Sequence, residues 1–159
     1  MSFKNKIRTP FLTVDALITL QNNKGKVEGI VLIERKYPPL GFALPGGFVE
    51  IGETVEEAVI REAKEETNLD VLIDYILGVY SNPNRDPRFH TVSVVFKCLA
   101  RGIPQGKDDA KKALVFPLDN LPLEKMVFDH SNIILDFLKK EYFDLYLFYK
   151  NTIYKNIKE

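Results

Sequence analysis

The chain alternates between apolar segments and short polar segments. Residues 11–20 and 27–36 are rich in β-branched and apolar side chains, and residues 21–26 between them have the Asn and Gly content of a tight turn. These two segments are predicted to pair as antiparallel strands. Three further strands are expected at residues 71–81, 90–102 and 111–118, and the polar loop 82–89 joins the first two of them.

A helix is expected between residues 55 and 68. Prolines and glycines interrupt residues 37–47, which predicts a loop that leads into a short strand. Thr54 and Glu57 then have the spacing of a capping box, in which each side chain bonds the backbone of the other residue. The helix should begin at Val55, and it should end near Asn68 because asparagine tolerates the left-handed backbone conformation that ends helices.

The last segment is also predicted to be helical. From Ser131 onward, Ile133, Ile134, Phe137 and Leu138 have the i, i+1, i+4, i+5 spacing of an amphipathic helix, so residues 131–159 are expected to be a C-terminal helical extension. Beyond Tyr142 the chain is more apolar than one side of a small domain needs. This tail either wraps the core or packs on a second subunit and makes a homodimer.

Composition and charge limit the classes of partner. With 159 residues and 45% hydrophobic content, the chain is expected to form one domain, residues 1–159. Its 22 basic and 22 acidic residues give no net charge, so no overall field attracts nucleic acid or a membrane, and neither is an expected partner. No signal peptide or membrane-spanning segment is recognisable, and the chain is predicted to be cytoplasmic. The single cysteine, Cys98, is expected to be reduced, buried and structural.

The predicted helix carries an unusual arrangement of negative charge. Glu62, Glu65 and Glu66 share an arc about 100° wide that overlaps the apolar side, whereas Glu57 and Lys64 lie on the solvent side. Like charges so close together are costly unless a counter-charge compensates them. A solvated helix face is the ordinary alternative. The geometry favours a divalent Mg²⁺ or Mn²⁺ ion, because one cysteine and two histidines offer almost nothing to softer metals.

Six residues around this helix resemble a known signature. Gly47, Glu53, Arg61, Glu62, Glu65 and Glu66 stand in the pattern G-x5-E-x7-R-E-x2-E-E, which is typical of the Nudix hydrolases. Asn68 stands where that signature usually has glycine, and Ala63 stands where it asks for an aliphatic residue. The resemblance implies an α+β fold, an α/β/α sandwich with a central mixed β-sheet and a C-terminal helix.

The resemblance also implies roles for these residues. Glu62, Glu65 and Glu66 would hold Mg²⁺, with Mn²⁺ as the alternative ion and the carbonyl of Gly46 as an additional ligand. Glu53 and Arg61 would be the supporting pair that orients the carboxylates. Water would attack a diphosphate, activated by Glu65 or by an acid of the loop that contains Asp108 and Asp109. A solvated loop is the alternative for these two aspartates.

Other segments resemble one branch of the family, the ADP-ribose pyrophosphatases. They are residues 40–50, residues 79–96 with Pro83 and Pro87, and residues 128–135. An ADP-ribose pocket needs a stacking surface and basic groups, and the candidates are Phe42, Arg35, Arg85 and Arg88. The alternatives are a core position for Phe42 and surface positions for the arginines. His90 and His130 are expected to be structural hydrogen-bonding residues rather than bases.

Three functions are compatible with these observations. The favoured one is magnesium-dependent hydrolysis of ADP-ribose to AMP and ribose 5-phosphate. The second is a Nudix hydrolase of nucleoside triphosphates or dinucleoside polyphosphates. The third is a module that binds ADP-ribose without cleaving it, which the six intact signature positions disfavour.

Overall fold

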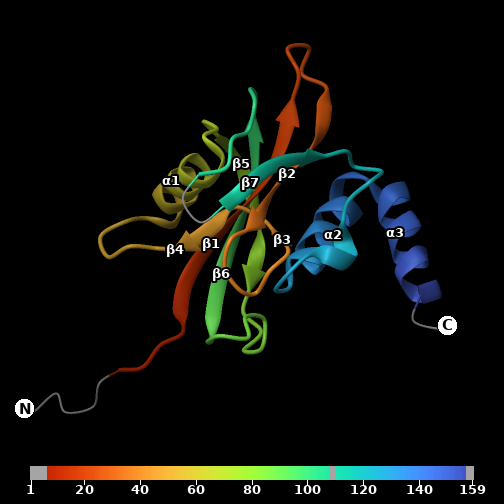
Figure 1. Cartoon of the computed structure of the whole chain (residues 1–159). Coiled ribbons are helices and arrows are strands. Elements are labelled where there is room, and N and C mark those ends of the chain that lie inside the picture. The colour runs from red at the N-terminus through yellow and green to blue at the C-terminus, as the bar shows by residue number, and fades with distance from the viewer. Residues whose placement is uncertain (1–6, 108–109, 157–159) are drawn as a thin grey trace, which may run out of the picture.

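The structure is a computed structural model and describes residues 7–107 and 110–156 (Figure 1). The strands are β1 (Phe11–Gln21), β2 (Val27–Arg35), β3 (Phe42–Ala43), β4 (Gly46–Phe48), β5 (Leu72–Tyr80), β6 (Thr91–Ala100) and β7 (Ala110–Phe116). The helices are α1 (Val55–Thr67), α2 (His130–Glu141) and α3 (Phe143–Asn156), with a short 3-10 turn at Leu123–Lys125.

The described strands form one mixed seven-stranded sheet. Its main path is β3-β2-β1-β6-β5, while β4 pairs with β1 and β7 pairs with β2. The predicted antiparallel pair of β1 and β2 is confirmed. Strands β1 and β6 run parallel along ten paired positions, from Phe11 opposite Thr91 to Leu20 opposite Ala100. Strand β1 therefore lies at the centre of the sheet, between β2, which follows it directly in the sequence, and β6, which comes about 80 residues later.

Alternate side chains of β1 enter two different apolar layers. Val14, Ala16 and Ile18 pack with Ala58, Val59 and Ala63 of α1, whereas Leu17 points to the opposite face and packs with α2. On that second face Ile133, Ile134, Phe137 and Leu138 are fully buried, as their spacing predicts. Helix α1 covers one face of the sheet, and α2 with α3 covers the other (Figure 1). The predicted α/β/α sandwich of the α+β class is confirmed.

Helix α1 has the ends that its sequence predicts. Thr54 Oγ1 accepts from the backbone of Glu57 at 3.1 Å, and Glu57 Oε2 accepts from the backbone of Thr54 at 2.8 Å. Asn68 has φ of 59° and its N–H donates to the carbonyl of Lys64. The helix therefore presents its carboxylates at fixed positions. Cys98 is buried, as expected.

The C-terminal segment forms two helices, α2 and α3, with a break at Tyr142 (φ −139°, ψ 63°). Helix α3 folds back on α2 and buries Tyr149, whose hydroxyl accepts from the N–H of Leu121 at 2.8 Å and donates to the carbonyl of Leu118 at 2.9 Å. One side of α3 thus covers the core, while other apolar side chains of α3 remain exposed. No helix in the described part of the chain is long and apolar enough to cross a membrane.

Candidate active site

Arg61 of α1 is the centre of a carboxylate cluster. Its Nε and Nη2 bind the two oxygens of Glu53 at 2.7 and 2.9 Å, and its Nη1 lies 2.9 Å from Glu62 Oε1 and 3.1 Å from Glu65 Oε2. Nη2 also donates to the carbonyl of Phe48 at 3.0 Å. One guanidinium therefore connects three glutamates to the end of β4. The two residues expected to be a supporting pair, Glu53 and Arg61, are in direct contact.

The pKa values of two glutamates in this cluster, Glu53 and Glu62, are shifted in opposite directions. The hydrogen bonds from Arg61 lower the pKa of Glu53 to about 2, so Glu53 is ionised at neutral pH. Burial raises the pKa of Glu62, and the hydrogen bond and charge of Arg61 only partly oppose that effect. Glu53 itself raises the pKa of Arg61 further above its usual value. Arg61 therefore stays charged and offsets the repulsion within the cluster.

Two glycines bring β4 against the cluster. Glu66 is buried, and its Oε2 accepts from the N–H of Gly46 at 3.0 Å. A Cβ on Gly46 would lie 2.2 Å from the carbonyl oxygen of Val14, and a Cβ on Gly47 would lie 2.3 Å from Glu62 Oε1. A larger residue at Gly46 would push β4 away from β1, whereas one at Gly47 would displace the carboxylate of Glu62. The bare backbone at these glycines is what allows the carboxylates to lie so close to the strand.

The donor atoms are suited to a hard divalent cation. Three carboxylates on one helix and the backbone of β4 offer oxygen ligands only, which Mg²⁺ and Mn²⁺ prefer. The residue types therefore suit such a cation. Within residues 7–107 and 110–156 no three acidic, histidine or cysteine side chains are grouped closely enough to hold a metal ion. Glu62 and Glu65 both accept from Nη1 of Arg61 instead. In the structure, the positive charge of Arg61 compensates the negative charge of these carboxylates. Asp108 and Asp109, the expected loop acids, lie outside the described residues.

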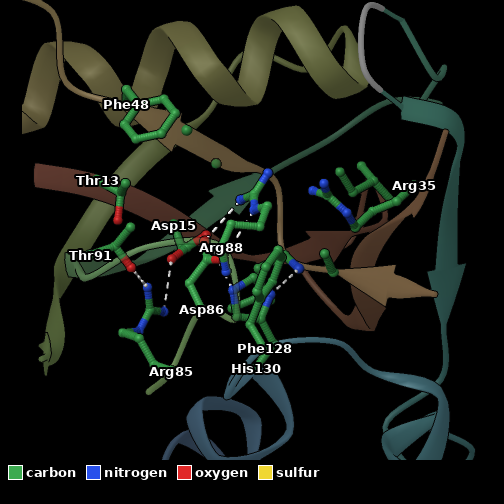
Figure 2. Close-up of a pocket in the computed structure, with 15 residues that line it drawn as sticks. Thr13, Asp15, Arg35, Phe48, Arg85, Asp86, Arg88, Thr91, Phe128 and His130 are labelled. Carbon is green, nitrogen blue, oxygen red and sulfur yellow. Dashed lines mark hydrogen bonds and ion pairs between the residues drawn. The ribbon is translucent and has the colours of Figure 1, made fainter. Parts of the chain in front are cut away.

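A pocket borders the backbone of Gly46 and Gly47, and Figure 2 shows the side chains that line it. Its wall includes Thr13 and Asp15 of β1, Phe48 of β4, and Phe128 before α2. Three of the four residues expected to bind substrate, Arg35, Arg85 and Arg88, also line it.

The fourth expected residue, Phe42, does not line this pocket. Its half-buried ring packs edge to face on Phe116, with ring centroids 5.1 Å apart, and it belongs to the core below α2. Phe42 therefore has the alternative position considered for it, in the core. The aromatic residues of the pocket wall are Phe48 and Phe128 instead.

Arg85 lines the pocket but does not present a free guanidinium. Its Nε and Nη2 bind Asp129 at 2.9 and 2.7 Å, its Nη1 donates to Thr91 Oγ1 at 2.9 Å, and Asp15 lies 3.7 Å away. Its side chain is only 5% exposed. The expectation of a phosphate-binding arginine is not supported here, and neither is the alternative of a solvated loop arginine. Arg85 is a buried cation that links β1 and β6 to the start of α2.

Arg35 and Arg88 flank the ring of Phe128. Their guanidinium carbons lie 5.1 and 5.3 Å from its centroid, within the range of cation–π contacts. Arg88 also binds Asp86 at 2.9 Å, and Arg35 Nε donates to the carbonyl of Pro39 at 2.9 Å. The side chain of Arg88 is 41% exposed, so of the two loop arginines it is the one that a ligand can reach.

The floor of the pocket contains two buried titratable groups. Burial raises the pKa of Asp15 to about 7, although Ser93 donates a hydrogen bond to it and Arg85 lies nearby. Burial and the charges of Arg85 and Arg35 lower the pKa of His130 to about 3. His130 Nδ1 accepts from the N–H of Leu44 at 2.9 Å, so its expected structural role is confirmed. His90 is exposed, and its backbone carbonyl accepts from the N–H of Phe11.

The prediction from sequence missed Asp15, Phe48 and Phe128 as pocket residues. Asp15 did carry a signal, since a carboxylate in the middle of an otherwise apolar strand must find buried partners. Phe48 and Phe128 carried none, because their positions depend on strand register and on the left-handed backbone of Phe128 (φ 57°).

Comparison with known proteins agrees with this geometry. The chain matches the NUDIX domain family over residues 11–137. An ADP-ribose pyrophosphatase from Methanocaldococcus jannaschii is 50% identical over 133 residues, which cover 82% of this chain and 74% of that protein.

Two solved structures are similar as well. The NUDIX domain of Shewanella oneidensis NrtR, in a cocrystal structure with ADP ribose, is 25% identical with a TM-score of 0.71, over 84% of this chain and 90% of that one. A bifunctional NMN adenylyltransferase/ADP ribose pyrophosphatase from Francisella tularensis, complexed with AMP and a Mn ion, is 29% identical with a TM-score of 0.67. That match covers 87% of this chain and 43% of the Francisella protein, so this chain spans less than half of its length.

An α/β/α sandwich with this carboxylate cluster on the helix after β4 defines the Nudix class of domain. The family match includes the whole of α1 and all seven described strands. The chain belongs to the Nudix hydrolases, a family of pyrophosphohydrolases.

Proposed function

We propose that this protein hydrolyses ADP-ribose to AMP and ribose 5-phosphate with Mg²⁺, with Mn²⁺ as an alternative ion. The observation that carries the proposal is the contact between the glutamates held by Arg61 and the backbone of Gly46 and Gly47, which also borders the pocket. A diphosphate at this edge lies against the cluster while its two substituents extend along the strands. The 50% identity to the M. jannaschii ADP-ribose pyrophosphatase supports the choice of substrate.

In this proposal Glu62, Glu65, Glu66 and the carbonyl of Gly46 hold the metal. The bound ion supplies charge neutralisation for the diphosphate and a lower pKa for the attacking water. Glu53 and Arg61 orient the carboxylates through their bidentate contact. Glu65, whose side chain is 45% exposed, accepts the proton of the attacking water, and Asp109 is the alternative base.

Substrate binding is assigned to fewer arginines than the sequence predicts. Arg88 and Arg35 lie beside the open part of the pocket and bind the charged or polyhydroxyl groups of the substrate. Arg85 acts through Asp15 and Asp129, by holding the pocket floor in place. A cytoplasmic location stays a prediction from the sequence.

We also propose a homodimer that uses the uncovered side of α3. Phe143, Leu147 and Phe148 are 55%, 40% and 55% exposed, although the opposite side of the same helix is buried on the core. Such a row of exposed apolar side chains is typical of a contact surface.

A panel assay with Mg²⁺ tests the proposed reaction. ADP-ribose, NADH, diadenosine polyphosphates and nucleoside triphosphates are incubated separately with the protein, and the products are separated by chromatography. We expect preferential conversion of ADP-ribose to AMP, and none when a chelator removes the metal. Preferential cleavage of another compound would support the proposed metal site but contradict ADP-ribose as the substrate. Binding of ADP-ribose without cleavage would instead favour a sensor, a function consistent with the ADP ribose bound to the NrtR domain.

A further inference from the structure

Three exposed phenylalanines contact one another at the edge of the pocket. Phe11, Phe48 and Phe89 are 55%, 45% and 36% exposed. Their ring centroids are 5.6 Å apart for Phe11 and Phe48, 5.2 Å for Phe11 and Phe89, and 5.8 Å for Phe48 and Phe89. They come from the start of β1, the end of β4 and the loop between β5 and β6. A single exposed phenylalanine needs no explanation, but three in mutual contact form a surface, here called the aromatic rim.

Strand register places the aromatic rim on the pocket side of the sheet. Phe11, Thr13 and Asp15 alternate along β1 and so share one face, and Thr13 and Asp15 line the pocket. Phe48 lies opposite Thr13 in the antiparallel pair of β1 and β4, and it also lines the pocket (Figure 2). The rim therefore continues the floor of the pocket outward along β1.

The surroundings of the rim indicate the chemistry of its ligand. The guanidinium carbon of Arg88 lies 5.0 Å from the ring centroid of Phe89, and Arg61 binds the carbonyl of Phe48. Gly47, the residue before Phe48, lies against Glu62. The three rings are tilted against one another by 71°, 62° and 41°, so they form an aromatic surface on which a planar group stacks against one ring and contacts the edges of the others. This surface begins one residue from the carboxylate cluster and has a cation at its side. A nucleobase, which is flat, aromatic and attached to a phosphate, fits these neighbours.

We propose that the aromatic rim stacks the nucleobase of the substrate and is a specificity-determining surface of this site. The nucleotide half then lies over Phe11, Phe48 and Phe89, and the diphosphate lies at the Gly46–Gly47 edge. This inference rests on the proposed function, because it takes the substrate to be a nucleotide. It adds that the nucleobase end of the substrate lies on the aromatic rim.

The absence of tryptophan in the sequence allows a test without turnover. Phe89→Trp places a unique fluorophore on the rim, and Phe143→Trp places one at a 55% exposed position on α3 as the control. Each variant is titrated, without metal, with AMP and separately with ribose 5-phosphate. We expect AMP alone to quench the Phe89→Trp emission with saturation, and neither compound to change the Phe143→Trp emission. No response to AMP, or equal responses to both compounds, would overturn the proposal.

A second measurement covers the case in which tryptophan perturbs the rim. Phe48→Ala should weaken AMP binding, measured by calorimetry, about tenfold, since base stacking on an aromatic ring has effects of that order. Unchanged AMP affinity would contradict the role of the rim in base stacking. A lower mass of the Phe48→Ala variant in light scattering would also contradict it, because it would show that a second copy of the chain covers these rings. Cleavage of ADP-ribose with no AMP response rejects the rim alone. An AMP response without cleavage rejects the proposed reaction and retains the rim.

Discussion

Gly47 lies so close to Glu62 that a Cβ on the glycine would be 2.3 Å from the carboxylate oxygen Oε1. The neighbouring Gly46 is equally restricted, but there the obstacle is the backbone carbonyl of Val14 at 2.2 Å. A carboxylate at the end of a side chain can rotate away, whereas a strand carbonyl cannot move without breaking the pair of β1 and β4. The two glycines therefore have different consequences when replaced.

Gly47→Ala should displace the Glu62 carboxylate and lower kcat about 100-fold, because a misplacement of this size is costly at a reacting centre. Its thermal unfolding temperature should change little. Gly46→Ala should instead lower the free energy of unfolding by about 1–3 kcal/mol, the usual cost of overpacking. Steady-state assays and thermal unfolding of both variants test this contrast. An equal loss of stability in both would show that Glu62 is not free to move.

Glu65→Gln should lower turnover about 100-fold or more while the fold remains intact, because glutamine retains the shape of the side chain and loses its charge. Glu56→Gln is the matched control, since Glu56 lies on the exposed side of the same helix. Turnover is measured with saturating Mg²⁺, and circular dichroism confirms folding. Wild-type turnover in the Glu65 variant would remove Glu65 from the mechanism.

The two arginines of the loop before β6 should respond differently to removal. Arg85→Ala leaves Asp129 and Asp15 without their cation in the interior, so the free energy of unfolding should fall by about 3–5 kcal/mol. Arg88→Ala should change stability little and raise KM, because its side chain is 41% exposed beside the pocket. Urea unfolding and steady-state kinetics of both variants separate these roles. A stable Arg85→Ala protein with a raised KM would restore Arg85 as a substrate ligand.

His130 should make stability depend on pH. Its folded pKa of about 3 lies below its usual 6.5, so between these values the unfolded chain binds a proton that the folded chain does not. Its contribution to the free energy of unfolding therefore falls as the pH drops below 6.5, by up to about 1.4 kcal/mol per pH unit. Asp15, Arg35, Arg85 and Asp86 surround this imidazole. Asp15 opposes the trend, because its folded pKa is raised to about 7 from 3.8 and its contribution to stability therefore grows as the pH falls.

The difference in free energy of unfolding between wild type and His130→Asn isolates the effect of His130. In His130→Asn the amide oxygen can still accept from the N–H of Leu44, but the side chain no longer titrates. The variant should be less stable than wild type at pH 7, and this deficit should shrink as the pH falls from 6.5 to 4. Urea unfolding of both proteins at each pH measures it. A deficit that stays constant would mean that His130 titrates normally in the folded protein.

Features that depend on local interactions were predicted correctly from the sequence, whereas some features that depend on contacts between distant residues were not. Helix α1 was predicted with both its ends because its capping box and its left-handed terminus are local. The partner of Arg85, by contrast, is Asp129, which lies 44 positions later in the sequence. Nothing in the residues around Arg85 indicates that it is buried. The arginine expected to bind substrate, with a solvated loop position as the alternative, is therefore found in the interior.

Register explains why Phe48 lines this pocket and Phe42 does not. Phe42 was the stacking candidate predicted from the sequence, and Phe48 lies on the other side of the same proline and glycines. Phe48 reaches the pocket because β4 pairs antiparallel with β1 and sets Phe48 opposite Thr13. Phe42 belongs to β3, which pairs with β2 instead. The metal-ligand candidates Glu62, Glu65 and Glu66 needed no such information, because all three lie on α1.

The C-terminal helix α3 allows the proposed dimer to be tested without truncation. Removal of the chain after Lys140 would also remove Tyr149, whose hydroxyl bonds the backbone of Leu118 and Leu121, so a change in mass could result from loss of the core. The double variant Phe143→Ser and Leu147→Ser changes side chains that are 55% and 40% exposed, and it leaves Phe148, which packs on Tyr149, in place. Light scattering should give the dimer mass for wild type and half that mass for the variant. Ile103→Ser, at an 82% exposed loop position, is the control and should remain dimeric. A wild-type monomer, or an unchanged mass in the double variant, would exclude α3 as the contact.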